Sequence, residues 1–250
     1  MYVLKLLKLL PIASLMLLAI ALSAPATRPK APKTGTPVGH STPGTTRPEA
    51  ACPDTPKPLT AIFANRGKDY TVAKYPSFYF YIPYTSQQVS SIEFLILNET
   101  ETKTIHHSLV ELQDRPGIIK VQLPKDAKNA LEVDRTYQWR FNLDCQPDET
   151  IAPDLVLNGW IKRVTASSEI TDELKSAKSE EYAIYQQHDL WYDAIANIGD
   201  LYFTNPEDKE IGKVWQTTLQ QLSLDWIIDE SFVNSRLEQF SVEQTNLFVK

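Results

Sequence analysis

The chain has 250 residues, of which 42% are hydrophobic and 22% are charged, as is ordinary for a globular protein with one large or two small domains. Its formal net charge of −6 argues against binding of the nucleic-acid backbone. Its 8 glycines argue against Gly-rich phosphate loops and Gly-rich repeat architectures.

Residues 1–24 are predicted to be a signal peptide. Lys5 and Lys8 precede an uncharged apolar run at 9–22, and "ALSAPA" then supplies small residues for cleavage after Ser23. The run is shorter than the roughly 20 residues that a membrane-spanning helix needs. We therefore expect export to the periplasm, the cell envelope or the extracellular space, without a membrane span after cleavage. The alternative is an uncleaved anchor.

Residues 25–50 are rich in Pro, Thr and Gly and almost free of large apolar side chains. Such a segment cannot bury enough surface to offset the entropy lost on ordering. The sequence therefore predicts a disordered, partly polyproline-like tether between the signal peptide and the folded part.

Short apolar runs separated by turn residues fill residues 51–165. The expected strands are 59–64, 75–85, 91–97, 104–112, 118–123, 135–145 and 154–164. This spacing is typical of an antiparallel β-sandwich. Leu131 stands six residues before Tyr137, which resembles the tyrosine corner of immunoglobulin-like and fibronectin type III sandwiches.

Residues 75–85, "YPSFYFYIPYT", are the most aromatic part of this region. Strand alternation places Phe78 and Phe80 on one face and Tyr79 and Tyr81 on the other. The Phe face is assigned to the core. Two interpretations of the Tyr face remain open: it packs under a helical segment, or it forms with Tyr84 an exposed platform for sugar rings.

Cys52 and Cys145 are the only cysteines. In an exported protein this count favours one disulfide, with two buried free thiols as the alternative. Cys145 shares the apolar face of its strand with Tyr137, Trp139 and Phe141. Two cysteines without CxxC spacing predict neither a zinc site nor a thioredoxin-type pair.

Residues 166–250 change in charge and in period. They hold 16 acidic and 6 basic residues, a net charge of −10, whereas residues 51–165 hold 14 acidic and 13 basic. Apolar side chains recur with helical spacing, and Asn205-Pro206 is expected to end the helix that contains Trp191. The order of Ala183, Trp191, Ala194 and Pro206 resembles one tetratricopeptide-type hairpin. We expect this hairpin plus a capping helix, with Trp191, Tyr192 and Trp215 as candidate contacts for a protein partner.

No pattern of residues points to catalysis. His106 and His107 point to opposite faces of a strand, so they cannot chelate one metal ion. The carboxylates of the helical half stand where solvated helix faces and first helical turns normally carry acid. We therefore predict no catalytic residue, no metal and no cofactor, although an envelope hydrolase that uses unpatterned acids stays possible.

Several segments together resemble the cyanobacterial family catalogued as domain of unknown function 928. They are "CPDTPKPLTAIF", "YPSFYFYIPY", "IEFLIL", "LEVDRTYQWRFNLDC", "GWIKRV" and "DLWYDAI". The resemblance implies an exported cyanobacterial protein with a β-rich core and a helical end, and it implies no activity.

The predicted class is thus α+β, with a β-sandwich at 51–165 followed by a helical domain at 166–250. The expected function is non-enzymatic binding or scaffolding of an envelope protein through the helical part. The alternative is binding of cell-wall polysaccharide by Tyr79, Tyr81 and Tyr84.

Overall fold

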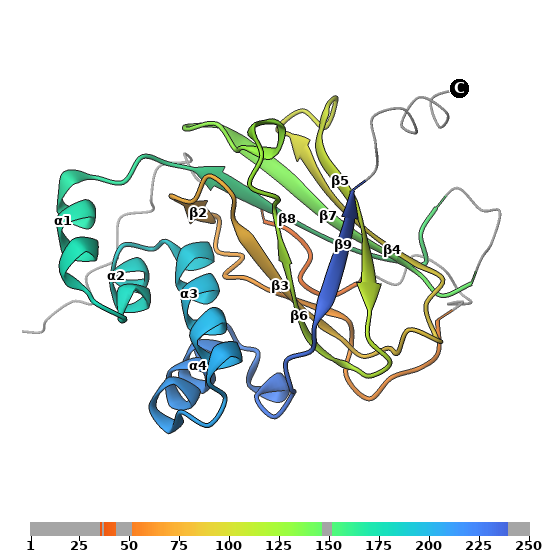
Figure 1. Cartoon of the computed structure of the whole chain (residues 1–250). Helices are drawn as coiled ribbons and strands as arrows, with labels where there is room; N and C mark the ends of the chain where they lie inside the picture. Colours follow the sequence, from red (N-terminus) through yellow and green to blue (C-terminus); the bar gives the residue numbers. More distant parts are fainter. Residues whose placement is uncertain (1–35, 37, 44–51, 147–151, 240–250) are drawn as a thin grey trace, which may run out of the picture. The chain divides into compact units, whose positions relative to one another are not determined.

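The computed structural model describes residues 36, 38–43, 52–146 and 152–239 (Figure 1). The predicted signal peptide and most of the predicted tether lie outside the described residues. Among those described, no helix is long and apolar enough to cross a membrane.

The described chain contains two β-sheets. The strands are β1 (Thr60–Ile62), β2 (Tyr70–Thr71), β3 (Ser77–Ile82), β4 (Ser91–Asn98), β5 (Thr104–Leu112), β6 (Gly117–Gln122), β7 (Thr136–Asp144), β8 (Leu155–Arg163) and β9 (Ser235–Gln239). One sheet has the order β2-β8-β7-β4-β5-β9 and the other the order β1-β3-β6. Every pairing is antiparallel except β2 with β8. All of the predicted strands are present, with ends shifted by at most three residues.

Four α-helices follow β8 in the described chain. They are α1 (Ser168–Ser176), α2 (Glu181–Gln187), α3 (Trp191–Thr204) and α4 (Lys209–Gln221). α3 ends before Pro206, as predicted, because proline disfavours helical geometry in the residue before it. The Asp208 carboxylate then accepts hydrogen bonds from the N–H groups of Glu210 and Ile211 and so begins α4. The structure thereby establishes the α+β class.

Aromatic and aliphatic side chains fill the space between the two sheets. Phe78 and Phe80 of β3 point into it, as their strand alternation predicts, and both are buried. The Phe80 ring stacks on Phe141 of β7 at 4.2 Å between ring centroids and meets Trp139 edge-on at 5.7 Å. The hydroxyl of Tyr137 accepts a hydrogen bond from the N–H of Glu132 (2.9 Å), which ties the start of β7 to the segment before it.

Besides the short strand β2, which was not expected, two parts of the chain differ from the sequence prediction. β9 belongs to the segment expected to be helical, yet it pairs with β5 at the edge of the larger sheet (Figure 1). Residues 38–43 belong to the predicted tether, yet His40 forms a β-bridge with Asn158 of β8. Both segments cover sheet edges, whose unpaired N–H and C=O groups attract any strand within reach. Neither segment is apolar enough for its own sequence to predict that it pairs with a sheet.

Candidate functional site

The tyrosines predicted as a sugar platform are buried. Tyr79 and Tyr81 lie on the helix-facing side of β3, and they are 2% and 5% exposed. Tyr84 is also buried, against the core between the sheets. The exposed platform is therefore wrong, because the helices cover this face of the sheet. The other interpretation, that Tyr79 and Tyr81 pack under the helical segment, agrees with the structure.

The aromatic residues predicted to contact a partner are buried as well. The Tyr192 hydroxyl accepts a hydrogen bond from Trp139 Nε1 (2.6 Å) and donates one to the carbonyl of Trp160 (3.1 Å). Trp215 is fully buried beside Tyr79, and Trp191 is covered by the Arg66 guanidinium at 5.0 Å. These side chains fix α3 and α4 to the sheets, since a helix turns its largest apolar groups inward. A partner cannot reach them in the folded chain.

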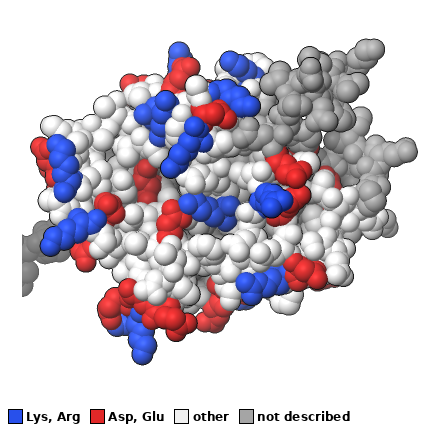
Figure 2. Space-filling view, in the orientation of Figure 1, with Lys and Arg blue, Asp and Glu red and all other residues white. Residues whose placement is uncertain are grey.

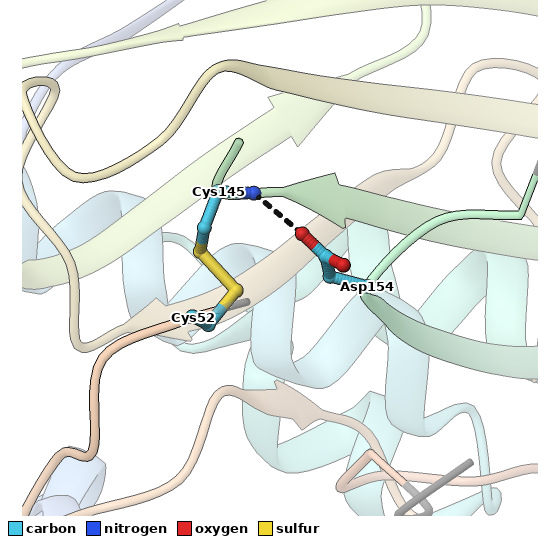
Figure 3. Close-up of side chains that lie close together, drawn as sticks. All are labelled: Cys52, Cys145 and Asp154. Atoms are coloured by element: carbon cyan, nitrogen blue, oxygen red, sulfur yellow. Dashed lines mark hydrogen bonds between the residues drawn. A yellow bond between two sulfur atoms is a disulfide. The ribbon is translucent and has the colours of Figure 1, made fainter. Parts of the chain in front are cut away.

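Cys52 and Cys145 form the predicted disulfide, with their Cα atoms 5.0 Å apart (Figure 3). The carboxylate of Asp154 lies beside it and accepts a hydrogen bond from the N–H of Cys145 (3.0 Å). Ligand atoms of these three residues lie within 4.8 Å of one another. The sulfurs are bonded to each other, however, so they are not thiolates and cannot ligate a metal ion. The cluster is structural.

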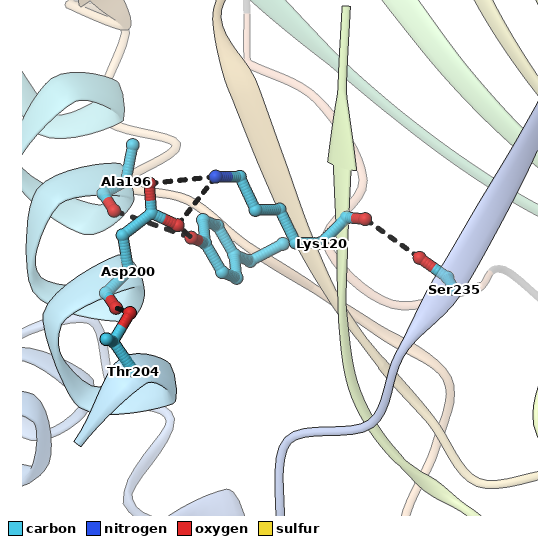
Figure 4. A network of polar contacts seen from close by, with 6 residues as sticks. Lys120, Ala196, Asp200, Thr204 and Ser235 are labelled. Atoms are coloured by element: carbon cyan, nitrogen blue, oxygen red, sulfur yellow. Dashed lines mark hydrogen bonds and ion pairs between the residues drawn. The ribbon is translucent and has the colours of Figure 1, made fainter. Parts of the chain in front are cut away.

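A polar network joins α3 to the smaller sheet at Asp200 (Figure 4). The Tyr79 hydroxyl donates to the Asp200 carboxylate (2.7 Å), and Lys120 Nζ of β6 contacts both carboxylate oxygens (2.6 and 2.8 Å). Burial and the nearby Asp200 charge raise the pKa of Tyr79 well above its usual value, so it remains a hydrogen-bond donor. Gly199 allows this approach, because a Cβ there would lie 2.8 Å from the Tyr79 ring.

Two hollows share Phe203 and Phe232 in their linings. The first, here the β6 pocket, has a volume of about 290 Å³. It is lined by Tyr79, Lys120, Gln122, Asp200, Phe203, Phe232, Val233, Asn234, Ser235 and Leu237. The second, of about 560 Å³, includes Tyr202, Gln216, Ile228 and Asp229. Phe203 is 47% exposed, which leaves a large aromatic face available between the two hollows.

Comparison with known families gives one match. The model of the family Domain of Unknown Function (DUF928) matches residues 42–232. The chain belongs to this family. The DUF928 match contains both sheets except β9, and it contains all four helices. No curated protein and no solved structure matches the chain.

Within the DUF928 segment, a second set of polar contacts anchors the start of α3 to the sheets. The Asp193 carboxylate accepts hydrogen bonds from the hydroxyl of Thr71 and the N–H of Val72, both at 3.0 Å. Burial raises the pKa of Asp193 to about 6, and these hydrogen bonds oppose the shift. Nearby, the Asp69 carboxylate accepts a hydrogen bond from the Thr36 hydroxyl (2.9 Å), and burial also raises its pKa.

The predicted histidines have structural partners. His106 is buried, with Nδ1 2.8 Å from the Asn129 side-chain oxygen and Nε2 3.1 Å from the Ser108 hydroxyl. Its neighbour His107 lies on the other face of β5, 3.3 Å from Glu93. Burial lowers the pKa of His106, which keeps this imidazole neutral near neutral pH. The expectation that the two rings do not converge on one metal ion agrees with this geometry.

Of the residues that line the β6 pocket, the sequence singled out only Tyr79 as a candidate site residue. Lys120, Asp200 and Asn234 come from β6, α3 and the segment before β9, so their proximity depends on the tertiary fold. Phe203 carried a weak signal, since it stands in the last turn of a helix, close to Pro206 and to a run of acidic residues. An apolar residue at this position is also expected in any amphipathic helix, so the sequence alone did not mark Phe203 as a binding residue.

Proposed function

We propose that this chain is an exported, non-enzymatic binding protein of the cyanobacterial envelope, and that its helical part recruits a protein partner. The observation that carries the proposal is the exposed Phe203 beside an acidic corner. Glu207, Asp208 and Glu210 follow it closely in the chain and are all exposed. An aromatic anchor with a polar, charged rim is the usual composition of a protein-binding surface.

The charge of the helical part indicates the kind of partner. Residues 166–232 contain 14 acidic and 4 basic residues, a net charge of −10. In Figure 2, acidic side chains gather at the lower left, with basic atoms among them, where Figure 1 draws α4. Complementary charge accelerates and orients association, so the proposed partner presents basic residues. Added salt shortens the Debye length, so we expect this binding to weaken as the ionic strength rises.

We also propose a tetratricopeptide-like hairpin for the helices and an immunoglobulin-like arrangement for the strands, both of which would suit a scaffolding role. The tetratricopeptide-like assignment of α2 and α3 is based on the spacing of Ala183, Trp191, Ala194 and Pro206. The immunoglobulin-like assignment is based on the spacing of the strands and on Leu131, which stands six residues before Tyr137. The hydrogen bond between Glu132 and Tyr137 supports it. Both describe frames that display loops and helix ends to partners.

The experiment is capture of envelope proteins on the immobilised chain, with partners eluted by salt. We expect Phe203→Ser to lose a partner that the wild type retains, with an effect of about 2 kcal/mol or more if Phe203 is a hot spot. Glu207→Lys with Glu210→Lys should lose the same partner. The matched control is Glu169→Lys with Asp172→Lys on α1, where both residues are exposed.

The outcomes separate specific from general charge effects. Retention of the partner by Phe203→Ser, or equal loss in the α1 control, would show that the α3–α4 corner is not its binding surface. Capture of no protein by the wild type would contradict the proposed function itself.

A further inference from the structure

We propose that the β6 pocket is a binding site for one ring of a neutral sugar. This site shares Phe203 with the proposed protein-binding corner, but sugar binding in the pocket does not depend on a protein partner. Its volume of about 290 Å³ lies just below the range for small-molecule sites, roughly 300–1,000 Å³. A pocket of this size suits a single ring better than an extended polymer.

The charges of the pocket favour a neutral ligand. Lys120 and Asp200 contribute one positive and one negative charge, and they are paired at 2.6 Å. An anionic ligand would have to compete with Asp200 for the ammonium group, and a cationic ligand would have to compete with Lys120 for the carboxylate. A hydroxyl group can instead donate to the carboxylate without breaking the pair, because a carboxylate has about four acceptor positions.

The Asp200 carboxylate is held in place before any ligand arrives. It receives the Tyr79 hydroxyl from the buried side, whereas the side chain of Asp200 itself is 51% exposed. Tyr79 is held in turn by its packing against Trp215 and Phe232. A fixed acceptor binds with less loss of side-chain entropy than a mobile one.

Two amide side chains at the pocket are available for hydrogen bonding. Gln122 lies at the end of β6, and Asn234 lies in the segment that leads to β9. Within the described part of the chain, neither side chain makes a hydrogen bond to another residue. Each amide offers both donors and an acceptor, which is the combination that adjacent sugar hydroxyls require.

The backbone of β6 adds polar groups on the same side. The N–H of Ile118 donates to the Ser231 carbonyl, and its carbonyl accepts from the N–H of Val233, both at 2.8 Å. Strand alternation directs the backbone of Lys120 and Gln122 to this same outer edge. The Ser235 hydroxyl already donates to the Lys120 carbonyl (2.8 Å), so the edge at Gln122 is the part left for a ligand.

Phe203 and Phe232 supply the apolar wall. Their ring centroids are 5.9 Å apart, with an angle of 54° between the ring planes. A pyranose ring has C–H groups on its faces and hydroxyl groups around its edge, so it can contact an aromatic wall and polar groups at once. Ligand sites commonly combine apolar walls with a few oriented polar groups in this way.

The test is saturation-transfer NMR on the full chain with glucose, mannose, galactose and N-acetylglucosamine at millimolar concentration. We expect transfer to ring C–H protons of at least one of these sugars. Gln122→Ala and Asn234→Ala should each weaken binding up to about tenfold, the effect of one lost hydrogen bond. Gln216→Ala is the matched control, because Gln216 lines the second hollow and not the β6 pocket.

Several results would overturn the proposal. They are no transfer to any of the four sugars, equal transfer in wild type and the Gln122→Ala, Asn234→Ala double variant, or loss of binding in the Gln216→Ala control. Competition of the sugar by a basic peptide would instead identify the pocket as part of the protein-binding surface. Asn234 is exposed, so Asn234→Ala tests the site without disturbing the core.

Discussion

The two faces of β3 are both buried, yet they are buried in different ways. Phe78 and Phe80 face the space between the sheets, where they contact other aromatic rings. Tyr79 and Tyr81 face the helices, and the Tyr79 hydroxyl bonds to Asp200. The first face is stabilised by apolar area and close packing, whereas the second also depends on individual polar contacts. The core between the two sheets is therefore expected to respond to lost volume, and the helix-facing seam to lost partners and to pH.

The largest effect is expected from Phe80→Ala. Phe80 is fully buried between Phe94, Trp139 and Phe141, so truncation leaves a cavity in the core between the sheets. The expected loss in the free energy of unfolding is about 3–5 kcal/mol, measured by urea denaturation. A loss below that of Tyr79→Phe, which removes only a hydroxyl, would show that the two faces do not differ as described.

Removal of the disulfide is expected to have the next largest effect. Cys52 and Cys145 are 93 residues apart, and their bond restricts the unfolded chain. The Cys52→Ser, Cys145→Ser double variant should lose about 2–4 kcal/mol of the free energy of unfolding. Reduction of the wild type should give a similar loss, with a mass increase of two hydrogens. Labelling of both cysteines in the untreated protein would contradict the bond.

The Asp193→Asn variant tests the pH response of the seam. The pKa of Asp193 is raised from 3.8 to about 6 in the folded chain. The folded state therefore binds the proton more tightly than the unfolded state does. This contribution to stability is fully present below the unfolded pKa, and it is lost as the pH rises through about 6. Over the whole window it amounts to about 3 kcal/mol.

The measurement is urea denaturation of both proteins from about pH 8 to about pH 4. We expect the wild type to gain stability relative to Asp193→Asn as the pH falls. The lowered pKa of His106 acts in the opposite direction, because protonation there favours unfolding, and the raised pKa of Asp69 acts in the same direction as Asp193. Both groups are present in both proteins, so the difference isolates Asp193. Parallel pH curves would rule out its titration.

The smallest effects are expected from two glycine substitutions on the helices. A Cβ at Gly199 would lie 2.8 Å from the Tyr79 ring, so Gly199→Ala should destabilise the seam by about 1–3 kcal/mol. A Cβ at Gly212 would meet only Tyr202, at 3.5 Å, so Gly212→Ala should stabilise α4 by about 0.5–1 kcal/mol. The measurement is the shift in the denaturation midpoint.

A double-mutant cycle checks the cause of the Gly199 effect. Tyr79→Leu removes the ring that the new Cβ would meet, so the two substitutions together should cost less than the sum of their separate effects. Strict additivity would show that Gly199 and Tyr79 are not in tight contact.

The sequence by itself determined the local elements of this protein. Alternation predicted the strands and the division of β3 into a Phe face and a Tyr face, because side-chain direction in a strand follows from the backbone alone. Helical spacing and Pro206 predicted where α3 ends. The count of two cysteines favoured the disulfide, which the structure contains. Each of these inferences depends on neighbouring residues or on composition.

The tertiary structure alone decided which aromatic faces are covered and which polar groups meet. The sequence does not show whether an aromatic side chain is buried or exposed. It therefore could not tell whether Tyr79, Trp191 and Trp215 pack inside the protein or form a binding surface. The pair of Lys120 with Asp200 joins residues 80 positions apart. β9 is a strand because it pairs with the edge strand β5, and the strand propensity of its own residues does not require it. Long-range contacts of this kind depend on how the sheets and helices pack together.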